Sequence, residues 1–307
     1  MNPKLTIVCF VALLAACRKT SVPEPSKTSA PPTPSVSSPV PTPKVEAPPS
    51  KPVDRLAAAH GDAEGVDHLA RSRELSEIGD RPGALLEAQR ALFDDPLDPD
   101  ALGAIAKLAE RMGKKEMAVE ALARLAEIDR DDPSPLVRQA RLLISLSRFD
   151  EALKVGRGAV ARDAEDADAH QVTGRALLGQ GELNAAIQSF ERVVELAPDH
   201  GYAWNNLGLA RLLANENDEA LDALTHAAQL LPEVAYVQNN FGIALERAGH
   251  LDEAMRAYAT AVELSPKYVK AKVNLQRLQQ LATTGEMPDT QELDEPSIEM
   301  KEAGAPE

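Results

Sequence analysis

Apolar and polar positions follow one pattern that repeats every 34 residues, and its most regular position is an alanine. The series runs Ala84, Ala118, Ala152, Ala186, Ala220 and Ala254 without an insertion. Each interval reads as two amphipathic helices separated by a short turn. A fixed period of this length predicts helical pairs that stack on their neighbours as a solenoid. The units are 65–98, 99–132, 133–166, 167–200, 201–234 and 235–268.

Two further columns of the pattern indicate where the helices end and where they approach closely. The residues at the turn are Gly79, Gly113, Ser147, Gly181, Asn215 and Gly249. Glycine and asparagine tolerate the left-handed conformation that ends a helix, so this column marks the end of each first helix. Small residues in the middle of the first helix are Ser72, Ala106, Ala140, Gly174, Gly208 and Gly242. We expect larger residues such as Phe190, Leu224 and Tyr258 to fill the spaces between successive units.

The pattern resembles the tetratricopeptide repeat. In one unit the signature positions hold Trp204, Leu207, Gly208, Ala220, Leu224, Ala227 and Pro232. In the next they hold Phe241, Gly242, Ala254, Tyr258, Ala261 and Pro266. The resemblance implies an all-α, right-handed α-solenoid of about six helix-turn-helix units, whose first helices line a concave surface for proteins or peptide segments. Ser72, Arg130 and Ala164 depart from the pattern in the first three units.

A further helix is expected after the last unit, over 269–283. Its packed face would carry Ala271, Leu275, Leu278 and Ala282. Gln276 stands where a packed repeat would have glycine, so nothing need dock beyond this helix. It is therefore interpreted as the capping helix that an open-ended solenoid requires.

The first 52 residues have the composition of an export signal and a tether. Residues 1–16 combine Lys4 with a short apolar run, and Leu14-Ala15-Ala16-Cys17 resembles a bacterial lipobox. That resemblance implies cleavage before Cys17 and lipidation there, although an ordinary signal peptide with an incidental cysteine would also fit. The proline-rich residues 17–52 favour an extended tether with a reach on the order of 100 Å. Arg18 and Lys19 come directly after Cys17, and the absence of an aspartate at these positions favours the outer membrane, with the protein facing the periplasm.

Two segments flank the repeats. Residues 53–64 are interpreted as a lead-in segment. Residues 284–307 carry eight carboxylates against Lys301 and are expected to be disordered, as a solubilising or an interaction tail.

Composition argues against several classes of function. The formal net charge of −15 disfavours nucleic acid as a partner. Cys9 and Cys17 both precede the repeats, and the six histidines are scattered and read as solvated surface residues. No metal site, cofactor or catalytic set is indicated, so the sequence predicts a protein that is not an enzyme.

Two columns of the first helices are candidates for the binding surface. The basic column consists of Arg73, Lys107, Arg141 and Arg175, with Arg138 beside it. These cations could bind carboxylates of a partner, or they could pair with internal acids such as Glu74 or Glu110. The amide column consists of Asn206, Asn240 and Asn274, with Asn205 and Asn239 adjacent.

Solvated amides could bind the main chain of an extended peptide, because each offers both a donor and an acceptor. Asparagine is also common at this column in the family generally, so a purely structural role stays open. Tyr202 and Tyr236 are expected to face inward and add contact area, whereas Trp204 is expected in the core.

The sequence therefore supports a lipid-anchored, non-enzymatic adaptor that helps to assemble an envelope complex such as a secretin or a pilus or motility machine. The architecture is similar to pilotin-like tetratricopeptide lipoproteins of type IV pili. An adaptor that positions cell-wall hydrolases or synthases is the alternative, and an enzyme is a remote one.

Overall fold

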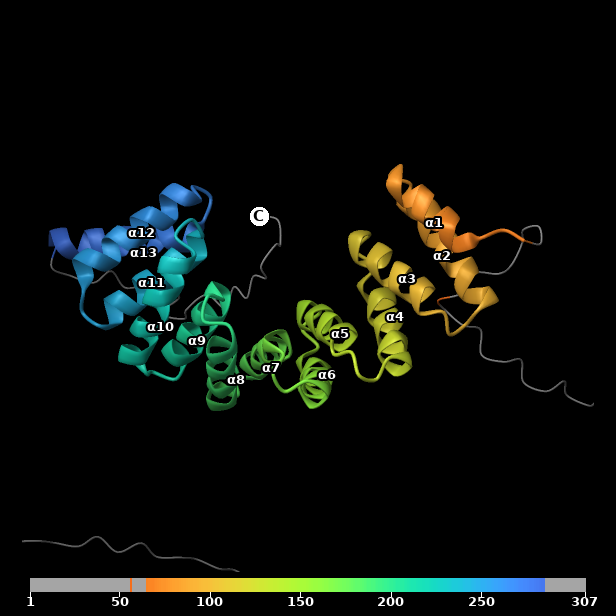
Figure 1. Ribbon diagram of the computed structural model, residues 1–307. Coiled ribbons are helices and arrows are strands. Elements are labelled where there is room, and N and C mark those ends of the chain that lie inside the picture. The colour runs from red at the N-terminus through yellow and green to blue at the C-terminus, as the bar shows by residue number, and fades with distance from the viewer. Residues whose placement is uncertain (1–55, 57–64, 285–307) are drawn as a thin grey trace, which may run out of the picture. The chain divides into compact units, whose positions relative to one another are not determined.

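The computed structural model describes Leu56 and residues 65–284, which form thirteen helices and contain no strand (Figure 1). The first helices of the six pairs are α1 (His68–Glu77), α3 (Pro99–Arg111), α5 (Ser134–Ser145), α7 (Ala167–Gln180), α9 (Gly201–Leu213) and α11 (Ala235–Arg247). The second helices are α2 (Arg81–Asp94), α4 (Lys115–Ile128), α6 (Phe149–Arg162), α8 (Leu183–Leu196), α10 (Asn217–Leu230) and α12 (Leu251–Leu264). The last helix is α13 (Val269–Thr284). The predicted all-α array of six pairs and a final helix is confirmed.

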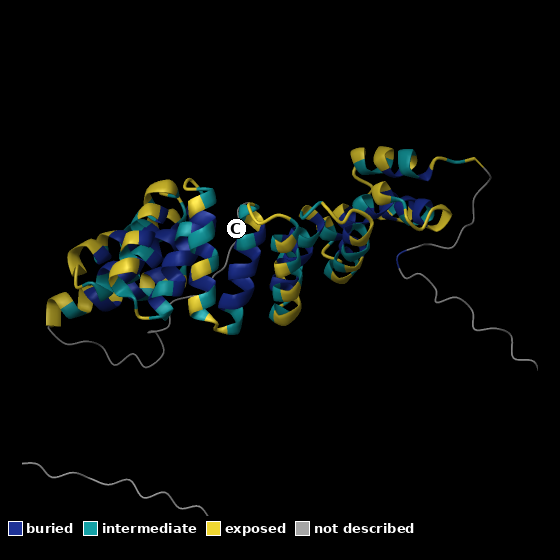
Figure 2. Ribbon diagram, turned by 60° about the horizontal axis from the view of Figure 1, so that its bottom comes forward, coloured by how far each residue is buried: buried dark blue, intermediate teal, exposed yellow. Residues whose placement is uncertain are grey.

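Each second helix packs against the first helix of its own pair and against the first helix that follows. Buried residues accordingly lie on the facing sides of neighbouring helices (Figure 2). The six alanines of the ladder that begins at Ala84 are all 0% exposed. These side chains let the helices approach closely, as the sequence pattern predicts.

The turn between the helices of every pair contains one residue with a left-handed backbone. All six residues of the predicted column have positive φ, including Ser147 at 58° and Asn215 at 61°. In α7 the backbone N–H groups that follow the last turn bond to the Leu177 and Leu178 carbonyls. The prediction that this column ends the first helix is confirmed.

Large side chains pack both inside their own repeat and against the next one. Leu224 shares an apolar cluster with Ala244, and Phe190 shares one with Leu207, so the expectation that they fill spaces between repeats is confirmed. A Cβ atom added at Gly174 would lie 2.7 Å from Cε1 of Phe190, in the second helix of the same pair. The same construction at Gly242 places Cβ 2.6 Å from Cε1 of Tyr258. The glycine column therefore provides the space for the large residue 16 positions later.

The helix α13 packs against α11 and α12 and covers the end of the array. Ala271 and Leu278 are buried as expected, but Ala282 is exposed and Leu281 takes its place against the core. This correction follows from the helical period, because position 281 lies three residues after Leu278. Gln276 is exposed, in keeping with a helix that has one packed face.

A polar cluster joins α13 to the last repeat. The Tyr258 hydroxyl donates to Glu246 Oε2 at 2.9 Å, and Arg277 Nη2 donates to the same oxygen at 2.6 Å. Burial raises the pKa of the Tyr258 phenol, and the nearby Glu246 carboxylate raises it further.

The predictions for residues 1–16, 17–52 and 285–307 lie outside the described residues. Of the predicted lead-in 53–64 the structure describes Leu56, which is 1% exposed and belongs to the apolar core of the first two repeats. None of the helices within residues 65–284 has the length and apolar character needed to cross a membrane.

Candidate functional site

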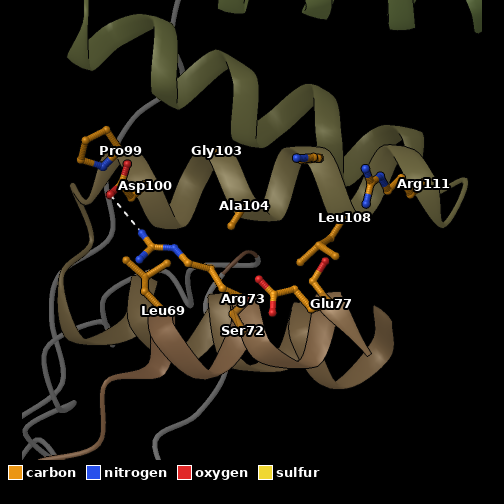
Figure 3. A pocket seen from close by; sticks show the side chains of 12 residues that line it. Leu69, Ser72, Arg73, Glu77, Pro99, Asp100, Gly103, Ala104, Leu108 and Arg111 are labelled. Carbon is orange, nitrogen blue, oxygen red and sulfur yellow. Dashed lines mark hydrogen bonds and ion pairs between the residues drawn. The ribbon is translucent and has the colours of Figure 1, made fainter. Parts of the chain in front are cut away.

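A cavity of about 430 Å³ lies between the first helices of the first two repeats, α1 and α3 (Figure 3). We call it the α1–α3 pocket. Its lining residues are Leu69, Ser72, Arg73, Ser76, Glu77, Pro99, Asp100, Gly103, Ala104, Lys107, Leu108 and Arg111. Arg73 and Lys107, two residues of the predicted basic column, therefore lie on its walls.

The pocket carries cationic groups that internal carboxylates leave accessible. Arg73 Nη2 lies 3.5 Å from Asp100 Oδ2, and both side chains are largely exposed, so this ion pair is weak. Within residues 65–284, the exposed side chains of Lys107 and Arg111 have no hydrogen bond or ion pair. These two cations can bind a carboxylate of a partner without first breaking an internal contact.

Gly103 provides the open part of the wall. It lies in the middle of α3, and a Cβ atom added there would meet no atom within 4 Å. The apolar side chains of Leu69, Ala104 and Leu108 complete the lining, as Figure 3 shows. Apolar walls with a few convergent charged groups are typical of a ligand-binding pocket.

The other predicted basic residues are paired or buried. Arg138 Nη2 lies 3.0 Å from Glu110 Oε1, and Arg141 Nη2 lies 2.6 Å from Asp168 Oδ1. Arg175 is only 6% exposed. The cations of this column are thus accessible mainly in the first two repeats, and the interpretation of internal pairing describes Arg138 and Arg141.

The asparagines of the amide column are not solvated, and that expectation is wrong. The exposures of Asn205, Asn206, Asn239, Asn240 and Asn274 lie between 0 and 8%. The Asn240 side-chain Nδ2 donates to Asn205 Oδ1 at 3.0 Å, and the Asn274 Nδ2 donates to Asn239 Oδ1 at 3.0 Å. Because successive first helices lie side by side, Asn240 and Asn274 each bond to the preceding first helix without a bound peptide.

The aromatic residues divide between the core and its edge. Tyr236 is 7% exposed, whereas Tyr202 is half-buried beside His200 at a ring distance of 6.4 Å. Trp204 is half-buried and packs against two core clusters. Its ring stacks on His226 at 4.6 Å.

Among the histidines of residues 65–284, His68 is buried, which contradicts the expectation that it is solvated. It is 3% exposed, and its Nδ1 lies 2.7 Å from the buried Glu87 Oε2. Position 68 corresponds to Trp204 in the repeat. A histidine can occupy this position in the first repeat because the buried carboxylate of Glu87 is its hydrogen-bond partner. Among the described residues, no group of three histidines, cysteines or carboxylates is placed to bind a metal ion.

Sequence reasoning missed Arg111, Asp100 and Gly103. Arg111 lies four residues after Lys107 on the same side of α3, so helical spacing was the available signal. Gly103 belongs to a column that otherwise holds larger residues, such as Leu69 and Val137. A glycine at an inward-facing position that holds larger residues in other repeats therefore indicates a pocket.

Comparison with known families agrees with this architecture. The tetratricopeptide repeat matches residues 69–133, 137–199, 172–235 and 235–268, which is more than half of the sequence. The chain belongs to the tetratricopeptide repeat family. Its repeat array is therefore a scaffold for protein–protein interaction, and proteins of this family are generally non-enzymatic.

Individual relatives are distant. Protein FlbA of Caulobacter vibrioides is 31% identical over 144 residues, which are 47% of this chain and 24% of FlbA. The chain thus spans about a quarter of the length of that relative.

Solved structures show the same fold. The Cut9–Hcn1 hetero-tetramer of the APC/C has a TM-score of 0.57 at 18% identity, over 69% of this chain and 42% of that one. MamA from Desulfovibrio magneticus RS-1 has a TM-score of 0.50 at 24% identity, over 55% and 96%. YrrB, described as a tetratricopeptide repeat protein with an unusual peptide-binding site, has a TM-score of 0.50 at 18% identity, over 62% and 97%.

Proposed function

We propose that this protein is a lipid-anchored adaptor of the bacterial envelope whose α1–α3 pocket binds an acidic segment of a partner protein. The observation that carries the proposal is the pair of accessible cations, Lys107 and Arg111, on the wall of a pocket that Gly103 leaves open. In a chain of net charge −15, two adjacent cations free of internal carboxylates favour an anionic ligand. The peptide-binding description of YrrB supports a peptide as the form of that ligand.

Filling the pocket tests this binding role. Gly103→Leu places a branched side chain in the cavity, whereas Gly103→Ala adds one methyl group and serves as the matched control. We expect a fluorescent glutamate-rich peptide to bind the unmodified chain and Gly103→Ala alike, and to bind Gly103→Leu more weakly. Equal binding to all three proteins would place the ligand elsewhere.

Reversing the charge of a lysine tests whether the cations of the pocket, and not only its shape, contribute to peptide binding. Lys107→Glu should weaken binding of the same peptide most at low salt, where Coulomb attraction is least screened. Arg192→Glu is the control, because Arg192 lies on α8 and pairs with Glu165 at 2.6 Å. The proposal fails if both reversals have the same effect.

The membrane anchor rests on Leu14-Ala15-Ala16-Cys17 and on the proline-rich residues that follow. Several acyl chains on Cys17 would give stable anchoring, and residues 18–52 would hold the repeats away from the lipid surface. Cys17→Ser should abolish incorporation of a labelled fatty acid and leave the precursor uncleaved. Equal labelling of the mutant and the unmodified protein would refute the anchor.

Assembly of an envelope machine, such as a secretin or a pilus or motility complex, is the role we assign to the anchored adaptor. Crosslinking in intact cells followed by purification identifies the partner. Capture of secretin or pilus subunits that Gly103→Leu abolishes would support this role. Capture of cell-wall hydrolases or synthases would favour the alternative instead.

A further inference from the structure

One junction in the array lacks the contact that all the others have. Between successive first helices, Cα atoms approach within 8 Å from α1 to α3 and again from α5 through α7, α9 and α11 to α13. The helices α3 and α5 have no Cα pair within this distance. The backbones of α3 and α5 therefore lie farther apart than those of the other successive first helices.

An ion pair that joins the first helices at two other junctions is absent here, as it is at the junctions after α7. Arg73 pairs with Asp100 and Arg141 pairs with Asp168, each joining a first helix to the beginning of the next one, 27 residues later. The equivalent residues of α3 and α5 are Lys107 and Ser134, so no carboxylate faces the cation. The remaining tie between these helices, from Arg138 to Glu110 at 3.0 Å, is partly exposed and weak.

The outer side of the same junction is held by packing of α4 against α5, as at the other junctions, and in addition by one arginine. Arg162 of α6 donates to the carbonyls of Ala126, Asp129 and Asp132 at 2.6, 2.9 and 2.7 Å. The linker that it contacts has five residues, 129–133, whereas the other linkers between described repeats have four. Leucine occupies the position of Arg162 in the next three repeats, at 196, 230 and 264.

Space for movement lies beside this contact. A cavity of about 520 Å³ opens between α4, α5 and α6, and Arg130, Leu136, Gln139 and Arg162 are among its lining residues. The buried members of the apolar core of the first two repeats end at Leu122 in α4, and those of the next cluster begin at Val137 in α5. The side chains that these clusters share across the boundary are half-buried: Leu142 of α5 packs against the first cluster and Val119 of α4 against the second. Contacts of this kind stabilise a boundary less than a continuous buried core does.

We propose that the junction between the second and third repeats is a hinge. The first two repeats, which carry the α1–α3 pocket, turn relative to repeats three to six about the linker 129–133. The hydrogen bonds of Arg162 hold the outer side of the junction together during this motion. The motion changes the distance between α3 and α5. The inner face of the array can therefore accommodate partner segments of different width. Hinge motions of this kind occur on the microsecond-to-millisecond scale.

Distances between spin labels test the hinge. The full chain with Cys9→Ser and Cys17→Ser carries labels at Arg111 and Ser145, which are exposed and lie on α3 and α5. The control pair is Glu77 and Arg111, at the same two repeat positions one junction earlier. We expect the distance distribution across α3–α5 to be about twice as wide as that across α1–α3. Equal widths would overturn the proposal.

Restoring the missing ion pair provides the second arm. Ser134→Asp places a carboxylate opposite Lys107, and Ser134→Asn is the uncharged control of the same shape. The aspartate should make the α3–α5 distribution narrower than the asparagine does, by the modest amount that a largely exposed ion pair supports. If both substitutions leave the width alike, the hinge does not arise from the missing ion pair, and the proposal in this form is wrong.

Discussion

Adding one methyl group to Gly174 should destabilise the protein, although the same change normally stabilises a helix. Replacing a mid-helix glycine by alanine usually gains about 0.5–1 kcal/mol, because the unfolded chain loses freedom. At Gly174 the new Cβ would lie 2.7, 2.9 and 3.0 Å from three ring atoms of Phe190. Carbon atoms in contact prefer about 3.5–4.0 Å, so the ring or the helix must move.

The magnitude follows from these two opposing effects. Phe190 is 0% exposed, so its ring is enclosed by other protein atoms. Overpacking of this kind costs about 1–3 kcal/mol. After the helical gain is subtracted, Gly174→Ala should lose about 0.5–2 kcal/mol in the free energy of unfolding.

Gly103→Ala is the matched control, because its Cβ meets nothing within 4 Å. It should gain about 0.5–1 kcal/mol, so the two variants shift stability in opposite directions. Urea unfolding followed by circular dichroism measures both, and the midpoints should differ by about 0.5–1 M. If Gly174→Ala stabilises the protein as much as Gly103→Ala does, the close contact with Phe190 costs nothing and the packing argument is refuted.

A double variant identifies Phe190 as the cause. Gly174→Ala with Phe190→Leu reproduces the Ala106 and Leu122 pair that the second repeat holds at these positions, both at 0% exposure. The double variant should be more stable than the sum of the single effects by about 1 kcal/mol, since the smaller side chain leaves room for the methyl group. Simple additivity would mean that the two positions do not interact.

Three further perturbations test the packing. Ala220→Leu forces three extra carbons into a site that is 0% exposed and should cost about 1–3 kcal/mol in urea unfolding. Asn239→Ala removes the acceptor of the buried Asn274 amide, so amide hydrogens of α13 should exchange faster than in the unmodified protein. The pKa of Tyr258 is raised by burial and by Glu246, so its neutral phenol stabilises the fold fully below the unfolded pKa. That stability falls above about pH 10, by up to about 1.4 kcal/mol per pH unit, and Tyr258→Phe should flatten this fall in unfolding midpoints between pH 9 and 11.

The repeated columns made the fold predictable from the sequence. A position such as Ser147 is ambiguous alone, but its alignment with glycines in the other repeats predicts its left-handed φ. The same columns did not reveal what Phe190 touches, because spacing alone cannot distinguish a partner in the same repeat from one in the next. The glycine 16 residues earlier settles this only when the helices are placed in space.

The site was predictable only in part, because its properties depend on contacts between repeats. The cations of the basic column appear accessible from the sequence, yet Arg141 meets a carboxylate 27 residues later. Asn205 appears to be a surface amide, yet its partner Asn240 lies in the next repeat. The α1–α3 pocket depends on the small residue Gly103, and a single column does not distinguish a filled space from an open one.

The buried amide pairs also bear on how the chain avoids folding in the wrong order. Tandem units of similar sequence can assemble with a neighbour skipped or exchanged between molecules. The bonds from Asn240 to Asn205 and from Asn274 to Asn239 form when α11 packs on α9 and α13 packs on α11. Placing α11 against α5 would bury an asparagine amide opposite Val137, at a cost of about 1–3 kcal/mol. These asparagines therefore favour packing of the last helices on one another over packing on the helices of the earlier repeats.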